Sequence, residues 1–68
     1  MAEEEIIWKA IDTNGGVLLG KGNSKMNSQL IRNILSSYQN VYNSVIIELF
    51  DQGCTERLGV FSNNKFIT

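Results

Sequence analysis

One amphipathic stripe limits the folds open to this chain more than any other feature. From Met26 to about Tyr42, apolar residues recur at intervals of one, three or four positions, which aligns them on one side of an α-helix. The stripe consists of Met26, Leu30, Ile31, Ile34, Leu35, Tyr38, Val41 and Tyr42. Asn23 or Ser24 is predicted to cap the helix, and Asn43-Ser44 to end it.

Two extended runs precede the helix. Glu5 to Asp12 is rich in β-branched and aromatic residues, and Val17 to Gly20 is a second apolar run. Thr13-Asn14-Gly15-Gly16 lies between them, and Asn-Gly between two apolar runs predicts a β-hairpin. Lys21 to Ser24 is predicted to be a loop that leads into the helix. The residues expected to share one face of the first strand are Ile6, Trp8 and Ala10.

Three further strands are predicted after the helix: Val45 to Asp51, Thr55 to Ser62 and Lys65 to Thr68, separated by turns at Gln52-Gly53 and Asn63-Asn64. In the second of them, Leu58 and Val60 alternate with charged or small residues. The residues expected to share a face of the first of these strands are Val45, Ile47 and Leu49. The prediction is one α+β domain over residues 1–68, with one helix on one face of a mostly antiparallel sheet in the order β-β-α-β-β-β.

The small size of the chain restricts how it can be stabilised. Domains of this size usually need a disulfide, a metal or an oligomeric partner. The 68 residues include one cysteine, Cys54, and no histidine, so we expect no intramolecular disulfide, no metal site and no cofactor. A homodimer, or a place as a subunit of a larger complex, is the remaining expectation.

Charge and hydropathy exclude several classes of protein. A formal net charge of −1 argues against a general binder of polyanions, and no apolar run is long enough to span a membrane. The opening Met1-Ala2-Glu3-Glu4-Glu5 has the opposite charge to a signal peptide. Together with the free thiol, this favours a cytoplasmic location.

The sequence contains only partial matches to known catalytic motifs. Gly15 to Gly22 resembles a phosphate-binding P-loop, but Gly22 occupies the position of the hydroxyl residue that should follow Lys21. Cys54 has no histidine that could activate it. The chain is therefore not expected to be an enzyme.

An anion-binding site is the alternative hypothesis. Lys21, Gly22, Asn23 and Lys25 precede the predicted helix, whose free backbone amides could contact nucleic acid or a phosphorylated small ligand. The competing interpretation is a flexible loop with solubilising lysines.

The polar side of the predicted helix is unusual because it is almost uncharged. Solvated helix faces normally carry Glu and Lys, whereas short uncharged polar groups are easier to desolvate in an interface. Compositional drift in an A+T-rich genome would give the same residues. The predicted partner-binding residues are Gln29, Arg32, Asn33, Ser36 and Asn40 on the helix, with Trp8 and Phe50 as anchors.

One family resemblance follows from this order of elements. The segment Ile11-Asp12-x-x-Gly15-Gly16-Val17-Leu18-Leu19-x-x-Gly22, followed by the helix and three strands, resembles a minimal roadblock or longin-type domain. The resemblance implies a non-catalytic scaffold subunit that dimerises by helix and edge-strand pairing and has its last strand in the centre of the sheet. Such proteins present surfaces to small GTPases or motor complexes.

The sequence therefore predicts a protein-interaction module that acts through its helix face and an exposed sheet edge. Its role would be that of an adaptor or scaffold subunit, or of a small phage- or bacterial-type inhibitor of a larger protein.

Overall fold

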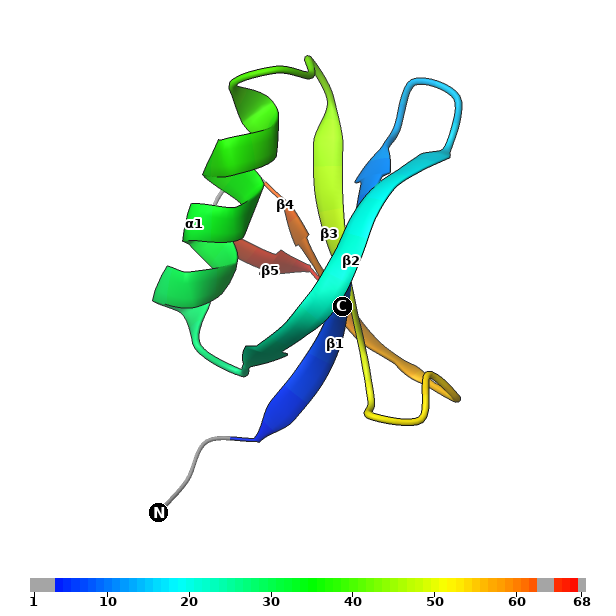
Figure 1. The fold of residues 1–68 in the computed structure, drawn as a ribbon, viewed down its shortest axis with the longest axis vertical. Helices are drawn as coiled ribbons and strands as arrows, with labels where there is room; N and C mark the ends of the chain where they lie inside the picture. The colour runs from blue at the N-terminus through cyan, green and yellow to red at the C-terminus, as the bar shows by residue number, and fades with distance from the viewer. Residues whose placement is uncertain (1–3, 63–64, 68) are drawn as a thin grey trace.

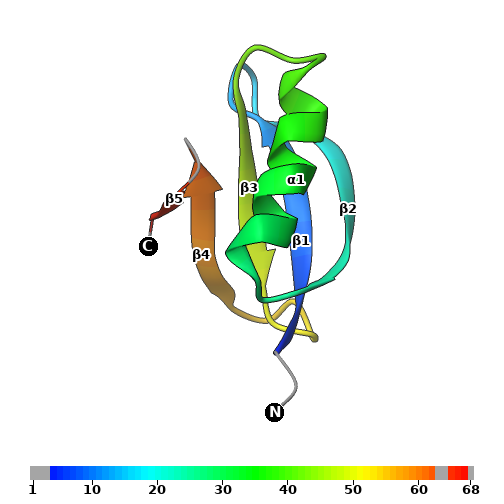
Figure 2. The same cartoon turned by 90° about the vertical axis from the view of Figure 1, so that its left-hand side faces the viewer.

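The computed structural model describes residues 4–62 and 65–67, which form a five-stranded sheet and one helix. The elements are β1 (Glu5–Asp12), β2 (Val17–Lys25), α1 (Ser28–Gln39), β3 (Val45–Phe50), β4 (Arg57–Ser62) and β5 (Lys65–Ile67). Neighbouring strands pair antiparallel in the order β2-β1-β3-β4-β5. Figures 1 and 2 show α1 on one side of this sheet, and in Figure 2 it lies in front of β3 and β1. The predicted α+β class is confirmed.

The first hairpin forms where it was predicted, but its second strand is longer. Gly15 and Gly16 have φ angles of +118° and +71°, which residues other than glycine rarely adopt. Strand β2 then runs to Lys25 instead of ending at Gly20, because it pairs with β1 from Asp12–Val17 to Glu5–Lys25. The predicted loop at Lys21 to Ser24 is therefore wrong. Continuous backbone pairing outweighs the weak strand preference of the glycines in this stretch.

The helix is shorter than the apolar stripe predicted. The side-chain oxygen of Asn27 accepts hydrogen bonds from the amides of Gln29 and Leu30 at 2.9 and 3.2 Å, so Asn27 is the N-cap, and not Asn23 or Ser24. The helix ends at Gln39 and not at Tyr42. Val41 is 74% exposed, so a further turn would have buried little apolar surface.

The hairpin between β3 and β4 is built on one carboxylate. Asp51 accepts from the Thr55 hydroxyl at 2.6 Å and from the Thr55 amide at 2.7 Å. These bonds hold Asp51 and Thr55 in the turn, so β3 ends at Phe50 and β4 begins at Arg57, slightly inside the predicted bounds. Strand β5 begins at Lys65 as predicted. The predicted Asn63-Asn64 turn and the predicted strand end at Thr68 lie outside the described residues.

The core lies between α1 and one face of the sheet, which we call the covered face. Both predicted strand faces are confirmed, since Ile6 and Ala10 are fully buried and Val45, Ile47 and Leu49 lie beside them. The buried residues are Ile6, Ala10, Ile31, Leu35, Val45, Ile47, Leu49 and Phe61. Phe61 was not predicted, because Leu58 and Val60 suggested the other set of alternating positions, whereas the register pairs Phe61 with the buried Ile47.

Candidate protein-interaction surfaces

The other face of the sheet, which we call the open face, has no element packed on it in the described part of the chain. The helix contacts β2, β3 and β4 from one side only (Figure 2). Strand alternation and register assign one set of described side chains to the open face. They are Glu5, Ile7, Lys9, Ile11, Leu18, Lys21, Asn23, Lys25, Ile46, Glu48, Phe50, Arg57, Val60, Ser62 and Ile67.

Apolar side chains occupy much of the open face. Ile7 is the cross-strand partner of Phe50, and Ile11 is the partner of Ile46. Leu18 and Ile67 stand at the flanks, 51% and 46% exposed. An antiparallel sheet with one face in the core usually has a polar outer face. The open face departs from that pattern, as an interaction surface would.

A charged row crosses the centre of the open face. Lys9 lies between Lys21 on β2 and Glu48 on β3. Glu48 forms an ion pair of 3.1 Å with Arg57. The Lys9 ammonium lies 4.6 Å from the centre of the Phe50 ring, a cation–π contact. A solvent-open hollow of about 500 Å³ adjoins the two lysines and is lined by Ile7, Lys9, Lys21, Gly22, Asn23 and Cys54.

The structure separates the two predicted aromatic anchors. Trp8 lies half-buried on the covered face, where its ring meets that of Tyr38 edge-on at 6.1 Å. Phe50 lies on the open face. Trp8 borders a shallow hollow of about 370 Å³ together with Asn33, so one of the predicted helix residues adjoins one anchor. A single interface cannot use both anchors without wrapping around the sheet.

The predicted residues of the helix face are all accessible. Gln29, Arg32, Asn33, Ser36 and Asn40 are exposed. Gln29 donates from its side-chain amide to the Asn33 side-chain oxygen at 3.2 Å. Among the described residues, Arg32 has no carboxylate within ion-pair distance. The helix face is therefore exposed, and Asn33 adjoins the hollow that Trp8 borders.

The proposed anion loop is not a loop. Lys21, Gly22, Asn23 and Lys25 all belong to β2, and the amides at the start of α1 are capped by Asn27. The amides of Gln29 and Leu30 are therefore bonded to Asn27 and are not free for an anion held by these lysines. The register instead brings Lys21 beside Lys9, which the sequence analysis did not select.

Two glycines of the P-loop-like segment, Gly20 and Gly22, allow close packing on the covered face. A Cβ atom on Gly20 would overlap the Tyr38 hydroxyl, and one on Gly22 would lie 3.0 Å from the Trp8 ring. Both glycines face the helix side of β2, across from Ala10 and Trp8. They leave room for the two aromatic rings to close that end of the core.

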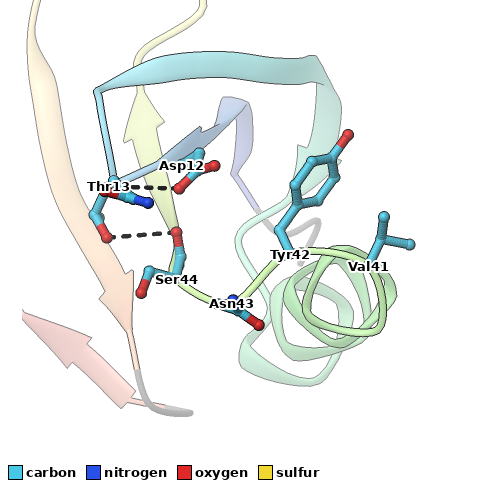
Figure 3. Close-up of a pocket in the computed structure, with 7 residues that line it drawn as sticks. Asp12, Thr13, Val41, Tyr42, Asn43 and Ser44 are labelled. Atoms are coloured by element: carbon cyan, nitrogen blue, oxygen red, sulfur yellow. Dashed lines mark hydrogen bonds between the residues drawn. The ribbon is translucent and has the colours of Figure 1, made fainter.

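A polar hollow of about 600 Å³ lies where the first hairpin meets the α1–β3 connection (Figure 3). The Thr13 amide and hydroxyl both donate to the Ser44 carbonyl, at 2.9 and 3.4 Å. The Asp12 carboxylate accepts from the Asn14 amide at 2.9 Å. These groups tie the two connections together, and we assign the hollow this structural role.

Comparison with protein-family models, with curated proteins and with solved structures finds no match for the chain. The roadblock or longin-type resemblance therefore stays a prediction. The position of β5 at the edge of the sheet differs from the central position that the resemblance implies. In the described residues, no helix has the length and apolar character needed to cross a membrane.

Two strands carried a signal for the open face that the sequence analysis did not use. In β1 and β3, the positions between the core residues are also mostly apolar: Ile7 and Ile11 in one strand, Ile46 and Phe50 in the other. Strands that are apolar on both sides are typical of sheets covered on both faces.

Proposed function

We propose that this chain is a non-enzymatic protein-interaction module whose principal docking surface is the open face. The observation that carries the proposal is the apolar character of a sheet face on which, in the described residues, nothing packs. Covering Ile11, Ile46 and Phe50 with a partner would remove apolar surface from water, the main driving force of protein association. A domain this small has few other means of gaining stability.

The helix face and the outer edge of β2 are the flanking surfaces in this proposal. Strand β2 is an edge strand of nine residues, and such an edge offers unpaired amides and carbonyls to another strand. The exposed polar groups of the helix face could hydrogen-bond across a second contact. Such a module suits a homodimeric or hetero-oligomeric adaptor and equally a small inhibitor. The exposed free thiol of Cys54 supports a reducing, cytoplasmic location for it.

Binding of nucleic acid or of a phosphorylated small ligand is the second candidate. It is favoured by one observation, the adjacency of Lys9, Lys21 and Asn23 around one hollow. Against it, the Lys9 ammonium covers Phe50, so the aromatic ring of the open face is not free to stack on a base.

Capture of partners by variants of the full chain tests the proposal. Ile46→Glu introduces a charge at the centre of the open face, while Arg32→Glu with Ser36→Glu does so on the helix face. Glu56→Gln, an exposed change in the β3–β4 turn, is the control. Circular dichroism first establishes that each variant is folded, and Ile46→Thr replaces Ile46→Glu if the latter unfolds.

We expect proteins retained by the unmodified chain and by Glu56→Gln to be lost with Ile46→Glu. Loss with the helix double variant alone would move the function to the helix face, as the sequence predicted. Retention of every partner by both variants would contradict the proposed function. A labelled single-stranded oligonucleotide whose binding weakens steeply with salt would favour the second candidate.

A further inference from the structure

The positive charge of this acidic chain is concentrated on one surface. The chain carries six lysines and arginines and has a formal net charge of −1. By register, Lys9, Lys21, Lys25 and Arg57 lie on the open face or at its end. Two carboxylates share this surface, so the open face has an excess of positive charge that the chain as a whole lacks.

Both carboxylates on the open face, those of Glu5 and Glu48, are already bonded to neighbouring side chains. Glu48 is bound to Arg57 at 3.1 Å. Glu5 is the cross-strand partner of Lys25 and accepts from the side-chain amide of Gln52 at 3.2 Å. Lys9 and Lys21 remain without an ion pair among the described residues.

Lys9 and Lys21 are direct cross-strand partners, an arrangement in which like charges repel. Asn23 adds a side-chain amide to the hollow that they share, and Ile7 forms part of its apolar lining. Lys9 and Lys21 line this hollow with Asn23, and the Lys9 ammonium lies 4.6 Å from the centre of the Phe50 ring. The cations therefore stand beside apolar surface, a setting suited to an anionic group on a partly apolar ligand. An anion between the lysines would turn their repulsion into two charge-assisted hydrogen bonds.

The surroundings of the hollow favour a protein carboxylate. Ile7, Phe50, Ile11 and Ile46 flank the charged row on both sides, whereas a nucleic-acid backbone needs a continuous basic track. A second copy docked face to face would set one positive excess against another. The chemistry that matches is a segment with apolar side chains and at least one Asp or Glu between them.

We propose that the open face binds an acidic protein segment, with a carboxylate seated between Lys9 and Lys21 and apolar side chains against Ile7, Ile11, Ile46 and Phe50. This inference rests on the proposed function and specifies the chemistry of the partner. The charged row would set the position of the segment, and the apolar rows would supply most of its affinity.

Fluorescence anisotropy with designed peptides tests the inference on the full chain. The probe is a labelled nine-residue peptide, the length of β2, with glutamate at its central position, leucine at the other odd positions and glutamine at the even positions. In an extended peptide this pattern presents the glutamate and the leucines on one face. Sister peptides carry glutamine or lysine in place of the glutamate. The protein variants are Lys9→Gln with Lys21→Gln in the charged row and Ile46→Glu in the apolar rows, and Glu56→Gln in the β3–β4 turn is the charge control.

We expect the glutamate peptide to bind about tenfold more tightly than the glutamine peptide, the ratio that a gain of ~1.4 kcal/mol gives. The lysine double variant should abolish this preference, Ile46→Glu should weaken the binding of both peptides, and Glu56→Gln should change the binding of neither. Added salt should reduce the ratio of the affinities for the glutamate and glutamine peptides, because it screens the charges.

The inference would be overturned by no binding of the glutamate peptide, by equal binding of the glutamate and glutamine peptides, or by a preference that survives the lysine double variant. Equal binding that Ile46→Glu abolishes would leave the proposed function standing while removing the acidic partner. Tighter binding of a labelled oligonucleotide than of the glutamate peptide would also overturn it and assign the lysines to phosphate.

Discussion

The two faces of the sheet differ in what packs against them. On the covered face, every alternate residue of β3 is buried against α1 or its neighbours, and no described residue with a polar or charged side chain is buried. On the open face, side chains of the same types, such as Ile46 and Phe50, remain half-buried beside Lys9 and Glu48. The covered face therefore accounts for folding, and the open face has apolar surface left over for a partner. When a strand has apolar side chains on both faces of the sheet, one helix can cover only one of the two faces.

The largest expected difference between the faces comes from removing a phenylalanine from each. Phe61 is fully buried, so Phe61→Ala should cost about 3–5 kcal/mol, enough to unfold so small a domain. Phe50→Ala on the open face should cost about 1 kcal/mol, because its ring is only partly removed from water. Urea denaturation followed by circular dichroism measures both values. Equal losses would show that the open face is part of the folding core.

The glycines of β2 test how closely the covered face is packed. Gly20→Ala should destabilise by about 1–3 kcal/mol, because the new methyl group would overlap the Tyr38 hydroxyl. Tyr38→Phe in the same chain should recover part of the loss by removing that oxygen. Gly53→Ala, whose Cβ would meet only a Thr55 methyl at 3.6 Å, is the control, and thermal melting compares all three. A neutral Gly20→Ala would mean that the aromatic end of the core is loose.

The start of the helix provides a smaller test of how the covered face is assembled. Asn27→Ala should cost about 1 kcal/mol through the lost N-cap, whereas Asn23→Ala on the open face should cost less than about 0.5 kcal/mol. Chemical denaturation resolves the two. The opposite order would restore the N-cap at Asn23 that the sequence predicted.

The smallest expected effect concerns pH. Hydrogen bonds from the Thr55 hydroxyl and amide lower the pKa of the Asp51 carboxyl from its ordinary value. Because the pKa of Asp51 is lower in the folded state, its ionised carboxylate stabilises the fold at pH values above the unfolded pKa of about 3.9. This contribution to the free energy of unfolding is lost as the pH falls through the folded pKa. Thr55→Val should raise the pKa of Asp51 toward that ordinary value, which an NMR titration of its side chain would detect. An unchanged titration would show that the hydroxyl bond does not form in solution.

Most of the covered face could be predicted from the sequence, and most of the open face could not. The alternation of Ile6, Trp8 and Ala10 and of Val45, Ile47 and Leu49 identified the core because each set has an apolar period of two. The predicted helix end was wrong because the apolar stripe continues past Gln39 to Val41, which is 74% exposed. The predicted start was wrong because β2 pairs with β1 as far as Lys25.

Register explains what was missed at the candidate site. Lys9 and Lys21 are twelve positions apart in the chain, and only the β1–β2 pairing brings them together. Trp8 and Phe50 were predicted as partner anchors without regard to face, and the pairing places them on opposite sides of the sheet. Composition suggests an acidic chain, while the arrangement of its strands gathers four cations on one side.

Site-specific photocrosslinking tests the central claim most directly. A photoreactive amino acid replaces Ile46 on the open face in one full-length variant and Ser36 on the helix face in another, and each is irradiated in cells. The account predicts a discrete adduct from position 46 that is lost when Ile11→Glu is added to the same chain, and a weaker adduct or none from position 36. No adduct from position 46, with or without one from position 36, would contradict the claim that the open face is the principal docking surface.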